Sequence, residues 1–410
     1  MKEVQPIGQS LLGFQSAVKQ SGQTLESYIH DTYISKWISD DLYHAMAIRS
    51  TFVNAMHNFL TDYGLFNMER VSLSPVTDPL AHDIEHVPSI SYKGHVYRGT
   101  HSMIYSKFLA CFHKNTKGVF VDSPNTRLEL ESPTNHQRGK YLIDFSQMDI
   151  EVRRNRNVSL ETYLNKPQEV KDILKEDFDS ALRFFEELLI HSVTAVIEKN
   201  EDDLKALGVA MEVPKSPFPR YKKDQAEQAH GAAKYEQKLG TEAKSQFYWI
   251  TGLMRENYDL IYPYLKPDGS KTQLNAFTSD EIYNYDICAQ SLQRDTNTYG
   301  DAYEICSGAI REWLFEPIIE RLLDNRIIAE RPIMTNGYIE NIEALEGYGP
   351  FLMAAAQKDA QGQPLFPETF GGGIGVERAL FALCKGKKIK TVDDITCFGK
   401  NPDSHPLYLF

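Results

Sequence analysis

Apolar residues recur at helical spacing in two long stretches of the chain. The first stripe lies between residues 48 and 59 and precedes Gly64, so it predicts a helix that ends there and an extended segment to Pro75. The second stripe spans 169–199 and predicts a long helix with one buried side. The stripes consist of Ile48, Phe52, Ala55, Met56 and Phe59, and of Val170, Ile173, Leu174, Phe178, Leu182, Phe185, Leu189, Val193 and Val196.

Residues 145–152 alternate between two kinds of side chain, as a β-strand does. One face carries apolar residues and Ser146, and we expect it to be buried. The other face joins an aromatic ring, an amide and two carboxylates, namely Phe145, Gln147, Asp149 and Glu151. An exposed strand face would alternate in the same way, but it would not explain the aromatic residue at its head. Residues 130–139 are polar and predict a hairpin loop to an earlier strand that carries Arg127 and Glu129.

A glycine strip near the C-terminus leads directly into an apolar helical pattern. Gly371, Gly372, Gly373 and Gly375 let the backbone pass close to a flat ligand. Arg378, at the head of the predicted helix, can lay its planar guanidinium on an aromatic ring such as adenine. A packing turn between two elements is the alternative reading of the glycines alone.

Residues 299–311 combine charged and very small side chains. Glu304 and Arg311 lie seven positions apart, and residues 306–309 are small, which leaves room for a ligand beside the backbone. A carboxylate can hold Mg²⁺ on a phosphate, and a guanidinium can grip a carboxylate with two hydrogen bonds. A salt bridge between Glu304 and Arg311 is the structural alternative.

These three patterns, in this order, resemble the catalytic core of class II aminoacyl-tRNA synthetases. The likeness is to the aspartyl and asparaginyl branch and to its asparagine-synthetase paralogues, and it extends from about Asp41 to Phe410. It implies an α/β (α+β) fold, with a class II synthetase-type antiparallel sheet flanked by helices. It also implies ATP and Mg²⁺ as cofactors, and a homodimer built on the first helix and extended segment; a helix buried in the core of a single chain is the alternative there.

The resemblance assigns a role to each matching residue of a nucleotide site. Arg127 would bind the α-phosphate of ATP, Glu129 would meet the adenine amino group, and Phe145 with Arg378 would sandwich the base beside Gly375. Glu304 would hold Mg²⁺, and Glu151 is a weaker candidate for metal or substrate contact. Arg127, Glu304 and Arg378 form the proposed catalytic set.

Other matching residues would bind the amino-acid substrate: Gln147, Asp149, Ser307 and Arg311. Residues 100–107 are similar to the substrate strip of bacterial ammonia-dependent asparagine synthetase, with Ser102 and Lys107 at its matching positions. Aspartyl-tRNA synthetases carry a Gln-x-x-Lys pattern there, and this chain departs from it at Met103 and Ser106. A surface lysine with a buried stem is the alternative for Lys107.

The chain has 410 residues and divides, on this resemblance, into a helical extension at 1–40 and a catalytic domain at 41–410. Residues 155–295 would form an insertion or connecting region, and the polar 266–280 would be a mobile part of it. Relatives that charge tRNA place a β-barrel of roughly a hundred residues before the core, and 1–40 offers no room for one. Net charge is −12, so we do not expect tRNA as a partner.

Five cysteines without paired spacing argue against disulfides and a cysteine zinc site. No apolar run is long enough to span a bilayer, and we expect a cytoplasmic protein. His82 and His86 lie near Asp83 and Glu85, but the prolines that flank them disfavour a helical metal site.

The sequence therefore predicts an AMP-forming ligase. In the leading hypothesis an aspartate carboxylate is adenylated and ammonia then forms asparagine. The alternatives are an aspartyl- or asparaginyl-tRNA synthetase-like ligase, an amide ligase for another acid and amine, and a non-catalytic binding module of the same shape. The candidate site holds arginines and carboxylates and no Ser-His or Cys-His nucleophile, which fits a reaction that depends on positioning and charge neutralisation.

Overall fold

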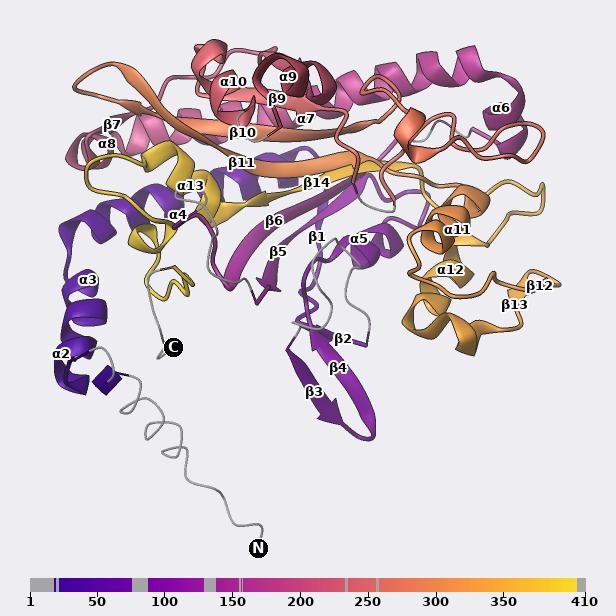
Figure 1. Cartoon of the computed structure of the whole chain (residues 1–410), viewed down its shortest axis with the longest axis horizontal. Helices are drawn as coiled ribbons and strands as arrows, with labels where there is room; N and C mark the ends of the chain where they lie inside the picture. The colour runs from indigo at the N-terminus through magenta and orange to yellow at the C-terminus, as the bar shows by residue number, and fades with distance from the viewer. Residues whose placement is uncertain are drawn as a thin grey trace, which may run out of the picture.

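A sheet that contains nine strands in the described residues forms the centre of the computed structural model (Figure 1). The structure describes residues 18–19, 22–75, 88–128, 138–154, 156, 158–232, 235–255 and 258–403. Neighbouring strands are antiparallel except for the β1–β5 and β8–β9 pairs. The order is β1 (Phe66–Asn67), β5 (Gly118–Thr126), β6 (Asp144–Arg153), β14 (Thr369–Gly375), β11 (Thr298–Ile310), β10 (Asn284–Gln293), β9 (Phe247–Thr251) and β8 (Arg220–Lys222), with β7 (Val209–Ala210) beside β10. The predicted antiparallel sheet flanked by helices is confirmed.

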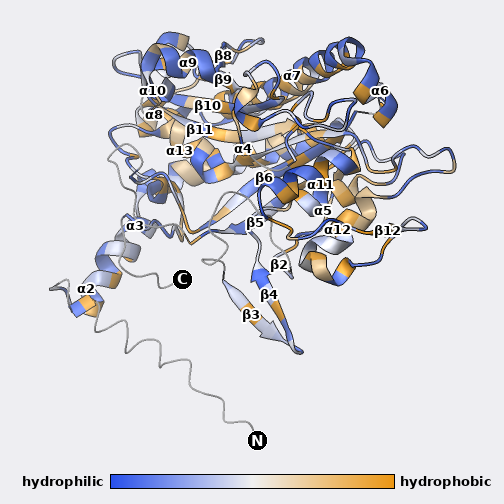
Figure 2. Cartoon of the chain, turned by 45° about the vertical axis from the view of Figure 1, so that its right-hand side comes forward, coloured by the Kyte–Doolittle hydropathy of each residue, from blue (hydrophilic) through white to orange (hydrophobic). Residues whose placement is uncertain are grey.

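The two helices predicted from the apolar stripes are present and pack on each other. Helix α4 (Asp40–Asp62) starts at Ser39, whose hydroxyl accepts a hydrogen bond from the amide of Asp41, and is followed by Gly64 with φ +93°. Helix α7 (Pro167–Lys199) matches the second stripe and alternates between hydrophobic and hydrophilic residues in Figure 2. The side chains of Phe52 and Met56 are fully buried inside the chain, so the first stripe belongs to the core.

Further helices and two small sheets surround the centre. The helices are α5 (Ile104–Ala110), α6 (Leu160–Asn165), α8 (Glu201–Leu207), α9 (Lys223–His230), α10 (Tyr235–Ala243), α11 (Phe315–Asp324), α12 (Gly349–Ala355) and α13 (Val376–Cys384). Short 3₁₀ turns occur at η3 (Leu274–Ala276), η4 (Ile342–Tyr348) and η5 (Val392–Ile395). The small sheets are β2 (Leu73–Ser74) with β4 (His95–Gly99) and β3 (Ser89–Tyr92), which projects from the body in Figure 1, and β12 (Met334–Thr335) with β13 (Tyr338–Ile339).

The N-terminal part described is helical and stands beside the sheet (Figure 1). It consists of α2 (Leu25–Ile29), a π-helical turn η1 (His30–Ile34) and α3 (Ser35–Trp37). The Trp37 indole N–H donates to the carbonyl oxygen of Cys397 at 2.9 Å, and Lys36 pairs with Asp393 at 3.0 Å. These contacts attach the segment to η5 and the chain that follows it.

The region expected to connect the two halves of the core contributes to the core itself. Strands β7 to β10 lie within residues 155–295, and all four belong to the central sheet. Residues 266–280 form a turn and η3, held by an ion pair between Lys271 and Asp324 at 2.6 Å. The mobility of this segment stays a prediction. All five cysteines are free. Among the described residues, no helix has the length and apolarity to cross a membrane.

Both faces of β6 are covered, so the alternative of an exposed strand face is wrong. Met148, Ile150 and Val152 lie in the core as predicted. Asp149 and Glu151, on the polar face, are only 2% and 0% exposed. They are buried because Lys107 of α5 and Arg311, just after β11, lie against them. Arg127 lies one residue past the end of β5 rather than within it.

Gly371 in β14 is required by a close approach to β6. A methyl group at this position would lie 2.4 Å from the carbonyl oxygen of Ile150 and 2.1 Å from a carboxylate oxygen of Glu151. The backbone contact cannot relax without moving the strand. At Gly375 the nearest atoms would be 3.8 and 4.0 Å away, which is ordinary contact.

We predict that Gly371→Ala lowers the free energy of unfolding by about 2–4 kcal/mol, the range of serious overpacking. Gly375→Ala is the matched control and should change it by less than about 1 kcal/mol. Urea unfolding followed by circular dichroism measures both. Equal stability of the two variants would show that β6 and β14 are not as close as described.

Candidate functional site

A cavity of about 310 Å³ opens on the face of the sheet formed by β6, β14 and β11. Most of the residues selected from the sequence line it, although they come from stretches more than two hundred positions apart. The lining includes Ser102, Lys107, Arg127, Phe145, Gln147, Asp149, Glu304, Ser307, Arg311, Gly375 and Arg378. Glu129 lies outside the described residues, and Glu151 lies behind the cavity wall.

The register of the sheet explains why these residues meet. Gly373 of β14 pairs with Asp149 of β6 on one side and with Ser307 of β11 on the other. The pairing of β11 with β10 shifts between Ile287 and Cys288, the kind of irregularity that a bulge produces. Glu304 and Ser307 are three positions apart and both line the cavity. A regular strand would point them to opposite faces.

One end of the cavity, the arginine end, carries Arg127, Phe145, Tyr141, Glu304 and Arg378. The guanidinium of Arg127 lies 5.2 Å from the centre of the Phe145 ring, and that of Arg378 lies 5.1 Å from the centre of the Tyr141 ring. Both distances permit cation–π attraction. Arg378 also approaches a carboxylate oxygen of Glu304 at 3.7 Å. This end presents flat cationic and aromatic surfaces together with a half-exposed carboxylate.

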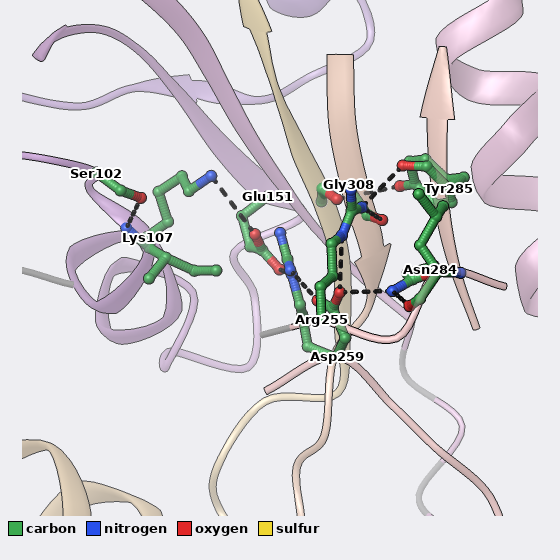
Figure 3. Close-up of polar contacts among 12 residues, drawn as sticks. Ser102, Lys107, Glu151, Arg255, Asp259, Asn284, Tyr285 and Gly308 are labelled. Atoms are coloured by element: carbon green, nitrogen blue, oxygen red, sulfur yellow. Dashed lines mark hydrogen bonds and ion pairs between the residues drawn. The ribbon is translucent and has the colours of Figure 1, made fainter. Parts of the chain in front are cut away.

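The other end, the lysine end, carries Ser102, Lys107, Asp149 and Arg311. The ammonium of Lys107 is 2.7 Å from a carboxylate oxygen of Asp149, and Lys107 is only 1% exposed. The alternative of Lys107 as a surface residue is therefore wrong. Glu151 lies 3.9 Å from Lys107, as Figure 3 shows, and 3.5 Å from Arg311.

Arg311 is fixed by a second carboxylate that the sequence did not single out. Its Nη1 donates to Oδ1 of Asp259 at 2.8 Å, and Asp259 is 1% exposed. Oδ2 of Asp259 accepts hydrogen bonds from the side-chain Nδ2 of Asn284 at 2.9 Å and from Nε of Arg255 at 3.4 Å. Figure 3 shows Asp259 between these donors. Arg311 pairs with Asp259 and Glu151, whereas Glu304 faces Arg378, so the expected alternative of a Glu304–Arg311 salt bridge is wrong.

Burial is the largest cause of the shifted pKa of Glu151. Its complete removal from water raises the pKa of this carboxyl above its usual value, while Arg311 and Lys107 act in the opposite direction. Glu151 does not line the cavity and lies beside the two cations, so its expected contact with a metal or substrate stays a prediction. We describe it as a residue that positions Lys107 and Arg311.

Several lining residues were missed from the sequence: Lys140, Tyr141, Arg255, Asp259 and Glu377. Tyr141 follows the polar loop whose end was placed at Gly139. Arg255 and Asp259 stand four positions apart after a buried strand, and that spacing was the available signal. The carboxylate of Glu377 accepts the backbone N–H of Ser146 at 2.9 Å and joins α13 to β6.

A family model matches the chain over residues 25–401, and its description is tRNA synthetases class II (D, K and N). The match spans all the segments that build the cavity. No curated protein sequence matches the chain.

Solved structures give the same picture of the fold. The chain is similar to asparaginyl-tRNA synthetase from Pyrococcus horikoshii complexed with asparaginyl-adenylate, at 16% identity and TM-score 0.60, over 93% of this chain and 74% of that one. It is also similar to asparaginyl-tRNA synthetase from Entamoeba histolytica in complex with asparaginyl-adenylate, at 13% identity and TM-score 0.62, over 92% of this chain and 71% of that one. Aspartyl-tRNA synthetase from Entamoeba histolytica is similar at 17% identity and TM-score 0.58, over 96% of this chain and 67% of that one. At these identities the likeness establishes the fold alone.

The buried pair of Lys107 and Asp149 yields a stability prediction. Lys107→Met leaves Asp149 buried without its cation, which should lower the free energy of unfolding by about 3–5 kcal/mol. The double variant Lys107→Met with Asp149→Asn should recover most of that loss, because both charges are gone. Urea unfolding measures all three proteins.

The exposed pair of Lys222 and Asp280 is the control. Lys222→Met should change the same free energy by less than about 1 kcal/mol. A Lys107→Met protein as stable as the wild type would contradict the description of this pair as buried and mutually dependent.

Proposed function

Since the chain belongs to the class II tRNA synthetases of the D, K and N type, we propose that it adenylates aspartate with ATP and transfers the activated acyl group to ammonia. An ATP-dependent ligase is what membership of this family implies. The proposal goes further in naming the acid and the acceptor. The observation that carries it is the lysine end of the cavity, where two buried cations and a buried carboxylate face the space that a substrate would occupy.

The lysine end suits a small zwitterion with an additional carboxylate. Asp149 offers an acceptor for an ammonium group, and Lys107 and Arg311 offer charge-assisted donors for a carboxylate. All three are at least nine-tenths buried, so these interactions are little screened by water. Glu151 and Asp259 hold the two cations in place before a substrate arrives, which reduces the cost of ordering the site.

The arginine end suits the nucleotide. The rings of Phe145 and Tyr141 and the guanidinium groups of Arg127 and Arg378 provide stacking surfaces for a purine and positive charge for its phosphates. Glu304 fits the Mg²⁺ that the family implies, because it lines the cavity and its side chain is 38% exposed. Its carboxylate oxygen lies 3.7 Å from Nη1 of Arg378, which is longer than a hydrogen bond. The ion, when bound, neutralises charge on the phosphates.

The proposed reaction has two steps. A carboxylate oxygen of aspartate attacks the α-phosphorus, the bond from that phosphorus to the bridging oxygen breaks, and pyrophosphate leaves. The nitrogen of ammonia then attacks the acyl carbon, AMP leaves, and one proton is released as the amide forms. The protein forms no covalent bond; Arg127 and Arg378 offset charge that develops at the phosphate, while Lys107 and Arg311 hold the acid.

Ammonia as the acceptor rests on the similarity of residues 100–107 to the asparagine-synthetase strip. Transfer to tRNA is the second candidate, and membership of a tRNA synthetase family favours it. The two candidates share the first step and differ only in what discharges the adenylate.

Exchange of labelled pyrophosphate into ATP identifies the activated acid. We expect exchange with aspartate and little with asparagine or glutamate, and we expect asparagine, detected by mass spectrometry, once ammonium is added. The folded double variant Lys107→Met/Asp149→Asn should lose aspartate-dependent exchange by about a hundredfold or more, since each lost charged hydrogen bond is worth about 1.5–3 kcal/mol.

Exchange with another acid but not with aspartate would support adenylation and contradict the proposal that aspartate is the activated acid. If tRNA discharges the adenylate and ammonium does not, the proposal of ammonia as the acceptor is wrong. Exchange with no acid at all would leave the non-catalytic alternative.

We also propose that two chains form a homodimer through α4 and β1. Phe66 on the edge strand β1 and Tyr43 on α4 are 63% and 69% exposed. Apolar residues on an edge strand are the kind of surface that a second chain covers.

Light scattering should give twice the chain mass of 46.8 kDa, and Phe66→Glu should shift the protein to the single-chain mass. Tyr338→Glu, at a position 67% exposed on β13, is the control and should leave the mass unchanged. A wild-type protein of single-chain mass at micromolar concentration would reject the dimer.

A further inference from the structure

Glu377 lines the cavity next to Arg378, and the sequence patterns assigned it no role. It stands in the first turn of α13, two residues after β14 ends at Gly375. The residue is only 7% exposed, although its side chain is charged. A buried carboxylate is stable only beside donors that satisfy it, so the partners of Glu377 indicate what it does.

Both oxygens of this carboxylate have a partner. Oε2 accepts the backbone N–H of Ser146 on β6 at 2.9 Å, and Oε1 lies 3.3 Å from Nη2 of Arg49 on α4. The side chain of Arg49 is half-buried. Helix α13 packs against both β6 and α4 (Figure 1). Glu377 therefore ties three elements together at the arginine end of the cavity.

The hydrogen bond to Ser146 continues a strand pairing beyond its end. Strand β14 pairs with β6 as far as Gly375, which lies opposite Gln147. The chain then turns into α13, and the carboxylate of Glu377 meets Ser146, the next residue of β6. The side chain thus supplies an acceptor where a longer β14 would have offered its backbone.

This one bond joins the immediate neighbours of the two groups expected to enclose the purine. Phe145 precedes Ser146 in the chain, and Arg378 follows Glu377. A base held between two flat groups needs each of them at about 3.5–4.0 Å, so the gap tolerates little change. The base stacks on both groups only while β6 and the start of α13 keep their separation.

A purely local role for Glu377 is the alternative. A carboxylate in the first turn of a helix is favoured by the free N–H groups there. An acid that served only the helix would affect the stability of the fold and leave the affinity for a nucleotide unchanged. The contact with Arg49 of α4 and the bond to β6 are not needed for such a role.

We propose that Glu377 sets the width of the slot between Phe145 and Arg378, as a positioning residue that Arg49 holds in place. The inference rests on the proposed function in one respect, namely that a purine enters between these two groups. Glu377 acts through its neighbours and does not need to touch the base.

Equilibrium dialysis of labelled ATP with Mg²⁺ measures the effect. Glu377→Ala should raise the Kd of ATP about tenfold or more, because stacking contributes a large share of the affinity for a base. Glu377→Gln keeps an acceptor oxygen at the same reach and should stay within about threefold of the wild type. Glu316→Ala removes an acid from the first turn of α11, outside the cavity lining, and should leave the Kd unchanged.

Two further measurements separate positioning from a general loosening of the fold. AMP should lose affinity for the Glu377→Ala protein by the same factor as ATP, since both carry the adenine, while the KM of the acid that supports pyrophosphate exchange should stay within about twofold. Arg49→Met should raise the Kd of ATP by about threefold. The double variant should bind ATP no more weakly than Glu377→Ala alone, because Arg49 acts through Glu377.

Circular dichroism establishes that each variant is folded. If Glu377→Ala does not fold, Glu377→Asp decides: it keeps the charge but shortens the reach by one methylene, and it should weaken ATP binding more than Glu377→Gln does. Wild-type ATP affinity in a folded Glu377→Ala protein, a loss for ATP without one for AMP, or tighter binding by the Asp variant than by the Gln variant would each overturn the inference alone. A wild type that binds no ATP would reject the nucleotide site of the proposed function, and the inference with it.

Discussion

A single row of paired residues across the central sheet determines where the charged groups of the site lie. The row runs from Val121 of β5 through Asp149, Gly373 and Ser307 to Asp286 of β10. Because pairing in an antiparallel sheet fixes which residues share a face, a shift of one residue in the pairing of β14 with β6 would place Ser307 on the opposite face from Asp149. The glycines of β14 make this register possible, since a methyl group at Gly371 or Gly373 would collide with a side chain of β6.

The electrostatics of the site follow from that row. Buried cations are stable only beside buried acceptors. At the lysine end, Lys107 has Asp149, and Arg311 has Asp259 and Glu151; next to it, Arg255 has Asp259 and Asp286. Such a network orders its side chains before a ligand arrives. This arrangement suits the adenylation that we propose, because that reaction depends on holding an acid and a phosphate in line rather than on a nucleophilic side chain.

The sequence alone predicted the long helices, the strand at 145–152 and the glycine strip leading into α13, since each carries a clear period or turn signal. Most of the site residues that it selected, through the three ordered motifs and residues 100–107, line the cavity. It did not predict that Asp149 and Glu151 are buried, because the residues that cover them, Lys107 and Arg311, are distant in the chain. Arg255 and Asp259 were missed because their four-residue spacing is the only local signal in their segment, and their roles depend on contacts with Arg311 and with residues of β10 and β11. The sharing of Arg311 between two carboxylates likewise depends on tertiary contacts.

The central claim is that Arg127, Phe145 and Arg378, from three separate stretches, together bind one nucleotide beside the Lys107–Asp149 pair. A crystal structure of the protein with ATP and Mg²⁺ tests this most directly. The account predicts the purine between the Phe145 ring and the Arg378 guanidinium, the α-phosphate against Arg127, and the metal at Glu304. A nucleotide bound elsewhere, or a cavity that stays filled by the side chains of Tyr141 and Arg378 at saturating ATP, would contradict it.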